Sequence, residues 1–272
     1  MVLADIGRGR EGQGARIAVV ARAVVLSRAS ANVVVRRTTG LSRRGLIGAA
    51  ACAGVSVAAA REGGPSLMMA GPGGAPVRLS GVLPPSAAEA GELGLRFDAE
   101  AQRFLAGLPP LGTDAEVSRD RWGPVAGRAG LKAARALVER GLALTDPAAV
   151  DAASAETLLS AEAAARAAGA GVFAHRAFRR ADADDAWPRI GLYAIIEGAA
   201  VETALVRRRR YINFSEDYRN DFTAIVDPEN GRAFRDYDFD ALIGSTHVYR
   251  GWVELWNGPL IRLSTPFQIQ NA

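Results

Sequence analysis

Four consecutive arginines followed by aromatic residues form a candidate binding site in the last third of the chain. Guanidinium groups bind phosphate and aromatic rings stack on bases, so a strand with this composition could hold single-stranded nucleic acid. The alternative is a solvated hairpin turn, or an edge strand that charge protects from aggregation. The residues are Arg207, Arg208, Arg209, Arg210, Tyr211 and Phe214.

A second pattern with chemical potential is an alternating row of aspartates. Asp236, Asp238 and Asp240 have the spacing with which a calcium-binding loop opens. Such a loop needs glycine at its sixth position and a bidentate glutamate at its end. This chain has Ala241 and His247 at those places, so the pattern predicts no metal site.

Other metal and nucleophile motifs are missing from the sequence. His175 and His247 lie far apart and the only cysteine is Cys52, so no site of histidine and cysteine ligands can be drawn. The acidic segment 182–185 is typical of a solvated linker, with a weak cation site as the alternative. Neither a Gly-x-Ser-x-Gly elbow nor a Walker loop occurs, which leaves other hydrolase and NTPase functions unsupported.

A first domain is expected from residue 61 to residue 180. Turn-forming glycines and prolines flank residues 66–70, and a second β-type segment follows at 77–82. These two segments are expected to pair as a hairpin.

Helices should follow that hairpin. Ser86 and Glu89 have the spacing of a capping box, which predicts a short helix there. Apolar residues at helical spacing predict an amphipathic helix at 99–108, and a further helix is expected to end at Gly141, a favourable C-cap residue.

A second domain is expected from residue 187 to residue 272, where the pattern changes to strands. An Asn-Gly-Pro turn after Trp256 predicts a hairpin between the last two strands. The expected strands are 190–203, 209–214, 222–226, 247–255 and 259–263.

The segment Val77 to Ser86 resembles the active-site strand of the thermonuclease, or staphylococcal-nuclease-like, family, which reads Arg-x-Leu-x-x-x-Asp-x-Pro-Glu. In that family the arginine binds phosphate, the aspartate holds calcium and the glutamate is usually assigned as the base. This chain keeps Arg78 but has Leu83 and Ser86 at the acidic positions. Leucine cannot ligate a hard cation, and an unassisted serine is no general base at neutral pH. The resemblance therefore implies a vestigial phosphate-binding arginine without a metal.

Further similarities to this family concern the scaffold and cover about residues 63–175. Leu137 to Ala143 matches Leu-Val-x-x-Gly-Leu-Ala, and Asp120 to Pro124 is similar to Asp-x-Tyr-Gly-Arg. In the second motif Pro124 replaces the other phosphate-binding arginine. Segments such as Tyr211 to Phe214 and Asn257 to Pro259 look like a C-terminal extension found in proteobacterial thermonuclease-like proteins.

These resemblances imply a mainly β fold with packed helices (α+β). A staphylococcal-nuclease-like OB barrel would be followed by a second OB-like barrel.

The first 60 residues are interpreted as an N-terminal extension and a Tat-type signal peptide. Arg43 and Arg44 directly precede an apolar stretch that is too short to span a bilayer, and small residues at 58–60 permit cleavage after Ala60. The expected location is periplasmic or secreted, with the Tat export machinery as a partner and no transmembrane segment after processing. Cys52 lies inside the apolar stretch; lipidation there is an alternative to removal with the signal.

Charge argues against non-specific binding of nucleic acid by the processed chain. Residues 1–60 carry nine arginines and two acids, a net of +7, whereas the whole chain carries +4, which leaves −3 for residues 61–272. A mildly acidic protein gains little from phosphate neutralisation.

The sequence therefore predicts an exported, non-enzymatic thermonuclease-like protein with a binding or structural role and no required cofactor. One alternative is an active metal-dependent phosphodiesterase, in which Glu89, Glu92 or Asp120 converges near Arg78 and holds calcium. The other is a nucleic-acid-binding module formed by the second barrel.

Overall fold

The computed structural model describes residues 66–120, 122–216 and 221–272. These residues form a mainly β structure with three α-helices, which agrees with the expected α+β class. The predicted extension and signal at 1–60, with Cys52, lie outside the described residues. Among the described residues, no helix is both long and apolar enough to cross a bilayer.

The first half contains a four-stranded sheet with the order β1-β2-β5-β4. The predicted hairpin is confirmed, since Met69 lies opposite Val77 in an antiparallel pair. β2 and β5 run parallel, whereas β3 pairs separately with β6. The strands are β1 (Met68–Ala70), β2 (Pro76–Leu79), β3 (Val82–Leu83), β4 (Ser118–Asp120), β5 (Gly123–Ala126) and β6 (Leu144–Thr145).

Helix α3 begins at Glu92, seven residues before the predicted start, because a nearby carboxylate satisfies its first amides. Glu89 accepts hydrogen bonds from the N–H groups of Gly91 at 2.9 Å and Gly94 at 2.6 Å. The predicted capping box was therefore wrong. Ser86 lies inside a 3-10 turn, Pro85–Ala87, that precedes the helix. The three helices are α3 (Glu92–Ala106), α4 (Leu131–Glu139) and α5 (Ala152–Ala167).

Helix α4 ends where two glycine-containing turns pack closely against each other. The end predicted at Gly141 is confirmed. Gly141 has φ +63° and Gly171, after α5, has φ +51°. A Cβ atom on Gly141 would lie 2.0 Å from the carbonyl oxygen of Ala170. Glycine is therefore required at this crossing by both backbone conformation and space.

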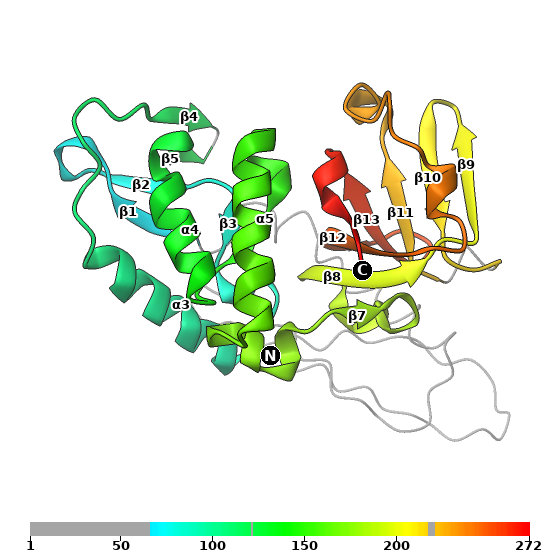
Figure 1. Ribbon diagram of the computed structural model, residues 1–272, viewed down its shortest axis with the longest axis horizontal. Helices are drawn as coiled ribbons and strands as arrows, with labels where there is room; N and C mark the ends of the chain where they lie inside the picture. Colours follow the sequence, from blue (N-terminus) through cyan, green and yellow to red (C-terminus); the bar gives the residue numbers. More distant parts are fainter. Residues whose placement is uncertain (1–65, 121, 217–220) are drawn as a thin grey trace, which may run out of the picture. The chain divides into compact units, whose positions relative to one another are not determined.

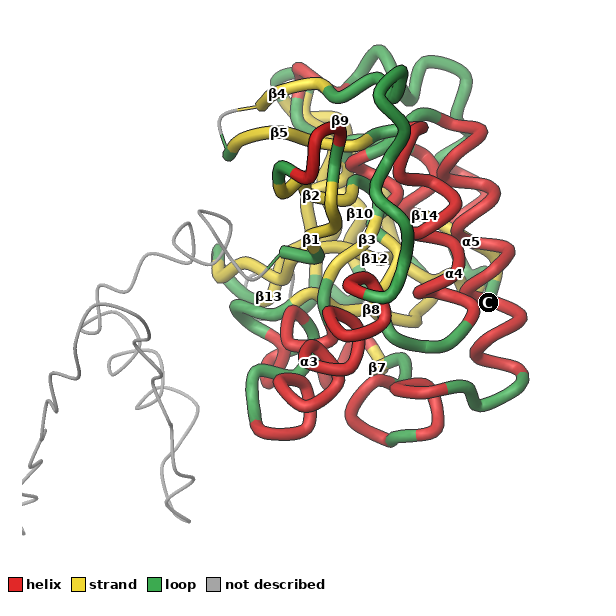
Figure 2. The backbone as a smooth tube through the Cα atoms, turned by 90° about the vertical axis from the view of Figure 1, so that its left-hand side faces the viewer, coloured by secondary structure: helices red, strands yellow, loops and turns green. Residues whose placement is uncertain are grey.

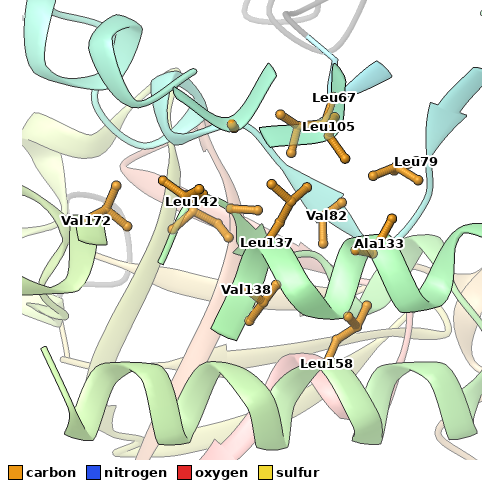
Figure 3. Close-up of a cluster of buried hydrophobic side chains, with 14 of the residues drawn as sticks. Leu67, Leu79, Val82, Leu105, Ala133, Leu137, Val138, Leu142, Leu158 and Val172 are labelled. Atoms are coloured by element: carbon orange, nitrogen blue, oxygen red, sulfur yellow. The ribbon is translucent and has the colours of Figure 1, made fainter. Parts of the chain in front are cut away.

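Helices α4 and α5 lie side by side (Figure 2), and they bury a hydrophobic cluster against the strands. Leu137 of α4 and Leu158 of α5 are fully buried in this cluster. They lie together with Leu79 and Val82 from the strand segment that carries Arg78 (Figure 3). The helices thus fix the strand that the sequence singles out.

The second half is an eight-stranded sheet that curls into a half-barrel (Figure 1). Its order is β7-β8-β12-β13-β11-β10-β9, and β14 pairs with β12. The predicted strand 190–203 is interrupted at Ala200 and Val201, which separate β8 from β9. The strands are β7 (Ala181–Asp182), β8 (Tyr193–Ala199), β9 (Glu202–Val206), β10 (Arg209–Asn213), β11 (Thr223–Val226), β12 (Thr246–Leu255), β13 (Pro259–Leu263) and β14 (Ile269–Asn271).

Two tight turns connect neighbouring strands of this sheet. Arg207 and Arg208 join β9 to β10 with φ values of 51° and 69°, the signature of a type I′ turn. Asn257, with φ 55°, and Gly258 join β12 to β13, which confirms the hairpin predicted there.

A buried polar network connects elements of the two halves. Glu162 of α5 accepts hydrogen bonds from Arg250 Nη1 of β12 at 3.2 Å and from Arg166 Nε at 2.7 Å. The Thr145 N–H donates to the same carboxylate at 2.8 Å, and the Tyr193 hydroxyl donates to the Thr145 carbonyl at 2.8 Å. This network fixes α5 against β8 and β12.

Candidate functional site

Arg78 lies on β2, and one terminal nitrogen of its guanidinium is paired with a carboxylate of the same sheet, whereas its Nε is buried without a hydrogen-bond partner among the described residues. β2 lies beside β5, and β5 pairs with β4, which brings Asp120 to Arg78 from 42 residues away. Nη2 of Arg78 forms an ion pair with Oδ2 of Asp120, while Oδ1 accepts the Trp122 N–H at 2.8 Å. Burial would raise the pKa of Asp120, but the Trp122 N–H and Arg78 outweigh it and lower this pKa. The arginine thus has a fixed anionic partner.

Leu83 and Ser86 stand where the resembled motif has acids, and their surroundings are apolar or structural. Leu83 pairs with Leu144 in the β3–β6 ladder and packs against the first hydrophobic cluster. Ser86 is buried, and its backbone N–H donates to Oδ1 of Asp98 at 2.9 Å. Burial raises the pKa of Asp98 although this hydrogen bond opposes it. Pro124, at the second phosphate position, lies on β5 without a donor to offer.

The acids that could replace those ligands do not converge on Arg78. Asp120 contacts it, but the Glu89 carboxylate is bound to the first amides of α3. Within residues 66–120, 122–216 and 221–272, no three histidine, cysteine, aspartate or glutamate side chains form a group that could hold a metal ion. The described side chains near Arg78 therefore do not fit calcium, which takes six to eight oxygen ligands.

An open cleft of about 430 Å³ lies between β5 and the start of α5. Ser80, Ser118 and Ser154 line it, together with Arg128 and Asp151. Arg128 Nε lies 3.0 Å from Oδ2 of Asp151, whose other oxygen accepts the Ser154 N–H and caps α5. The cleft has polar and apolar surface in similar amounts, and its charges compensate each other. The hydroxyls of its three serines donate to backbone carbonyls or to Asp151 and not to a histidine base.

The arginine and aromatic residues predicted to bind nucleic acid are divided between the two faces of β10. Arg209 and Tyr211 share one face, whereas Arg210 and Ile212 point to the other, because strand residues alternate. Phe214 packs against the buried residues Phe222 and Tyr249, and Arg210 lies over the Phe239 ring at 4.7 Å. Arg207 and Arg208 occupy the turn. The structure therefore groups Arg209 and Tyr211 with that turn and directs Phe214 into the core.

A tryptophan that the sequence argument assigned only to a turn completes the face with Arg209. The guanidinium of Arg209 lies 5.0 Å from the Trp256 ring centroid, and that of Arg262 lies 5.3 Å from it. Asp227 is buried and accepts from Arg209 at 2.7 Å and also from Arg262, which in turn donates to Glu254 at 2.9 Å. These contacts join residues of different strands. The sequence alone therefore indicated only the Asn-Gly-Pro turn after Trp256.

The remaining candidate residues have local structural roles. Asp238 accepts the N–H groups of Asp240 and Ala241, which makes the aspartate row a turn. His175 packs edge-on against Phe97 at 5.4 Å between ring centroids. His247 Nδ1 lies 2.9 Å from the Ser245 carbonyl oxygen.

Comparison with known proteins identified no match: no family model, no curated protein and no solved structure is similar to this chain. The thermonuclease resemblance therefore remains a prediction that depends on the short motifs described above.

Proposed function

We propose that this chain is a binding or structural protein that resembles a thermonuclease but does not hydrolyse phosphodiesters. The ion pair between Arg78 and Asp120 carries this proposal, because it offsets the charge of the guanidinium that would otherwise hold phosphate. Leu83 and Ser86 add neither a hard-cation ligand nor a base. The predicted export signal would place this protein outside the cytoplasm.

Two features of strand order support OB-type barrels in both halves. In the first half, β1-β2-β5-β4 with parallel β2 and β5 is the order expected of strands two, three, five and four. In the second half, β9-β10-β11-β13-β12-β8 with parallel β11 and β13 is the order expected when the first strand is bent into β8 and β9. Such barrels commonly serve as binding modules.

A nuclease assay with added calcium tests the loss of activity. The full chain should leave double- and single-stranded DNA intact at the rate of a protein-free blank, since removal of a catalytic metal or base typically lowers rates by orders of magnitude. Circular dichroism on the same sample establishes that the protein is folded. Calcium-dependent cleavage that disappears in Asp120→Asn would instead support relocated ligands.

A second candidate function is the binding of single-stranded nucleic acid by the second half. The cluster of Arg209, Arg262 and Trp256 favours it, because an exposed ring beside guanidinium groups can stack on a base while the arginines of the adjacent turn contact phosphate. In an OB barrel, the face of strands two and three and the loops 1–2 and 4–5 form the binding surface. In the proposed barrel these would be the partly exposed face of β10, since every residue of β11 is buried, with the turn at Arg207 and the turn after Trp256.

Fluorescence anisotropy with a labelled oligonucleotide tests this second function. Trp256→Ala should weaken binding by about tenfold, as expected for the loss of one stacked base. Trp187→Ala, an exposed tryptophan outside the cluster, is the matched control. Affinity that does not change between two salt concentrations, or equal effects of the two variants, would eliminate this function.

A further inference from the structure

One edge of the eight-stranded sheet is open along β9. This strand is last in the sheet order, and among the described strands it pairs with β10 only (Figure 1). Its residues Leu205 and Val206 are 62% and 52% exposed and lie on opposite faces of the sheet. An exposed apolar edge strand is a template for pairing with another strand.

The register of the hairpin shows which backbone groups are available for such pairing. Val206 lies opposite Arg209 across the two-residue turn, and residues that flank a type I′ turn exchange both hydrogen bonds. Bonding then alternates along the strand, so Thr203 and Leu205 direct their N–H and C=O groups away from β10. Of these two residues, Leu205 is the more exposed.

A neighbouring turn limits the open stretch at the start of β9. Asp240 Oδ1 lies 3.5 Å from the Thr203 hydroxyl, and the Gly244 N–H donates to the Ala200 carbonyl at 2.9 Å. Pairing must therefore be centred on the second part of the strand, around Leu205.

We propose that β9 is a self-association site, at which the β9 strands of two copies pair antiparallel about a two-fold axis through Leu205. This register places the two Leu205 side chains together and sets Ala204 beside Val206 of the second copy. It also brings Glu202 toward the turn of the second copy that holds Arg207 and Arg208, and the symmetry makes each contact twice. Opposite charges at both ends and apolar side chains in the middle make the strand complementary to itself.

The leucine pair distinguishes this register from its nearest alternative. A shift by two residues, centred on Ala204, also aligns the outward backbone groups, but it sets Leu205 against Thr203. The contact between the two Leu205 side chains is then lost. Cross-strand pairs of opposite charge each stabilise a sheet by about 0.2–1 kcal/mol, and like charges disfavour pairing by similar amounts.

This inference goes beyond the proposed function, since it concerns association of the chain and not its ligand. The paired stretch is short, so we expect a weak, reversible dimer. Sedimentation velocity of the full chain, from about 10 µM to about 500 µM, covers the range in which an interface below standard size associates.

Two kinds of variant test the site. Leu205→Pro removes an N–H that points away from β10, so it should leave the fold intact and abolish the dimer, because proline is tolerated at the outer side of an edge strand. Glu202→Arg, and the joint change of Arg207→Glu and Arg208→Glu, should each raise the dimer dissociation constant by about tenfold, as like charges replace opposite ones at both ends of the paired strands. The variant that combines all three changes should return to within about threefold of the original constant.

Glu229→Arg, at an exposed position outside β9 and its turn, is the matched control and should have a smaller effect. If Leu205→Pro proves unfolded by circular dichroism, the charge variants still decide the matter. A chain that remains monomeric throughout the concentration range would overturn the proposal. A combined charge variant that stays as weakly dimeric as Glu202→Arg would do the same.

Discussion

At the residue scale, the buried carboxyl of Glu162 has a pKa far below its usual value. Burial by itself would raise its pKa, but the charges of Arg250 and Arg166 and the Thr145 N–H outweigh burial and lower the pKa from 4.5 to about 2. The Glu162 side chain is 1% exposed, so loss of its charge leaves two arginines without their shared partner. The ionised carboxylate is thus part of the folded structure.

The stability of the protein should therefore fall between pH 4.5 and pH 2 through this one group. A folded-state pKa below the unfolded value gives stabilisation that is complete above about pH 4.5 and is lost as the pH falls toward 2, with a magnitude of about 3 kcal/mol. Urea unfolding at several pH values measures it. Glu162→Gln should lower stability at pH 7 and flatten this part of the pH profile. An unchanged slope in the variant would contradict the assignment.

Sequence reasoning at this scale named the residues that would occupy the positions of the resembled motifs but not what they contact. The sequence alone shows Leu83, Ser86 and Pro124 where those motifs have charged residues. The pairing of Arg78 with Asp120 depends on two successive strand registers, β2 with β5 and β5 with β4. Trp256 likewise meets Arg209 only after β10 and β13 are placed beside β11. Such contacts are set by tertiary pairing, which short patterns do not encode.

At the element scale, the crossing of the turns after α4 and α5 should tolerate substitution poorly. Gly141→Ala combines a left-handed φ with a collision against the Ala170 carbonyl, so we expect a loss of about 3 kcal/mol or more in unfolding free energy. Gly169→Ala is the matched control. Gly169 has the similar φ of +62° but open space around its Cβ position, and should lose only about 1 kcal/mol.

Denaturant unfolding of both variants measures the difference. Equal losses would show that backbone conformation alone matters and that the two turns can move apart.

Element boundaries were predictable where local chemistry decides them. Gly141 ends its helix and the Asn-Gly-Pro turn forms its hairpin, because both depend on backbone conformations that glycine permits. The predicted start of α3 was too late. Glu89, three residues before the helix, accepts hydrogen bonds from its first amides, whereas the sequence argument assigned Glu89 to a separate short helix capped by Ser86. The break between β8 and β9 carries no glycine or proline, so a single strand was predicted there.

At the scale of the whole molecule, the two hydrophobic clusters should unfold together. Arg250 Nη1 reaches Glu162 across 88 residues of sequence, Nη2 donates to Gln270 Oε1 at 2.7 Å, and the Arg250 carbonyl accepts from Gln268 at 3.0 Å. One side chain thus connects α5, β12 and the C-terminal strand. Sequence patterns give no sign of such a contact, since Glu162 lies in an alanine-rich helix and Arg250 in a strand, with no motif that pairs them.

Calorimetry of Arg250→Met tests this coupling. The unsubstituted chain should show one transition, whereas the variant leaves Glu162 incompletely paired and should lose about 3–5 kcal/mol and unfold less cooperatively. Arg135→Met, which removes an exposed pair with Glu139 on α4, should cost less than about 0.5 kcal/mol. Similar thermograms for the two variants would show that the buried network does not couple the two clusters.

The position of β14 has a consequence for the order of events during synthesis. Residues 269–271 pair with the beginning of β12, and Gln268 and Gln270 bond to Arg250 in its middle. The longest of the described strands therefore stays incomplete until residue 271 has left the ribosome exit tunnel. The eight-stranded sheet cannot close while its own earlier strands are being synthesised.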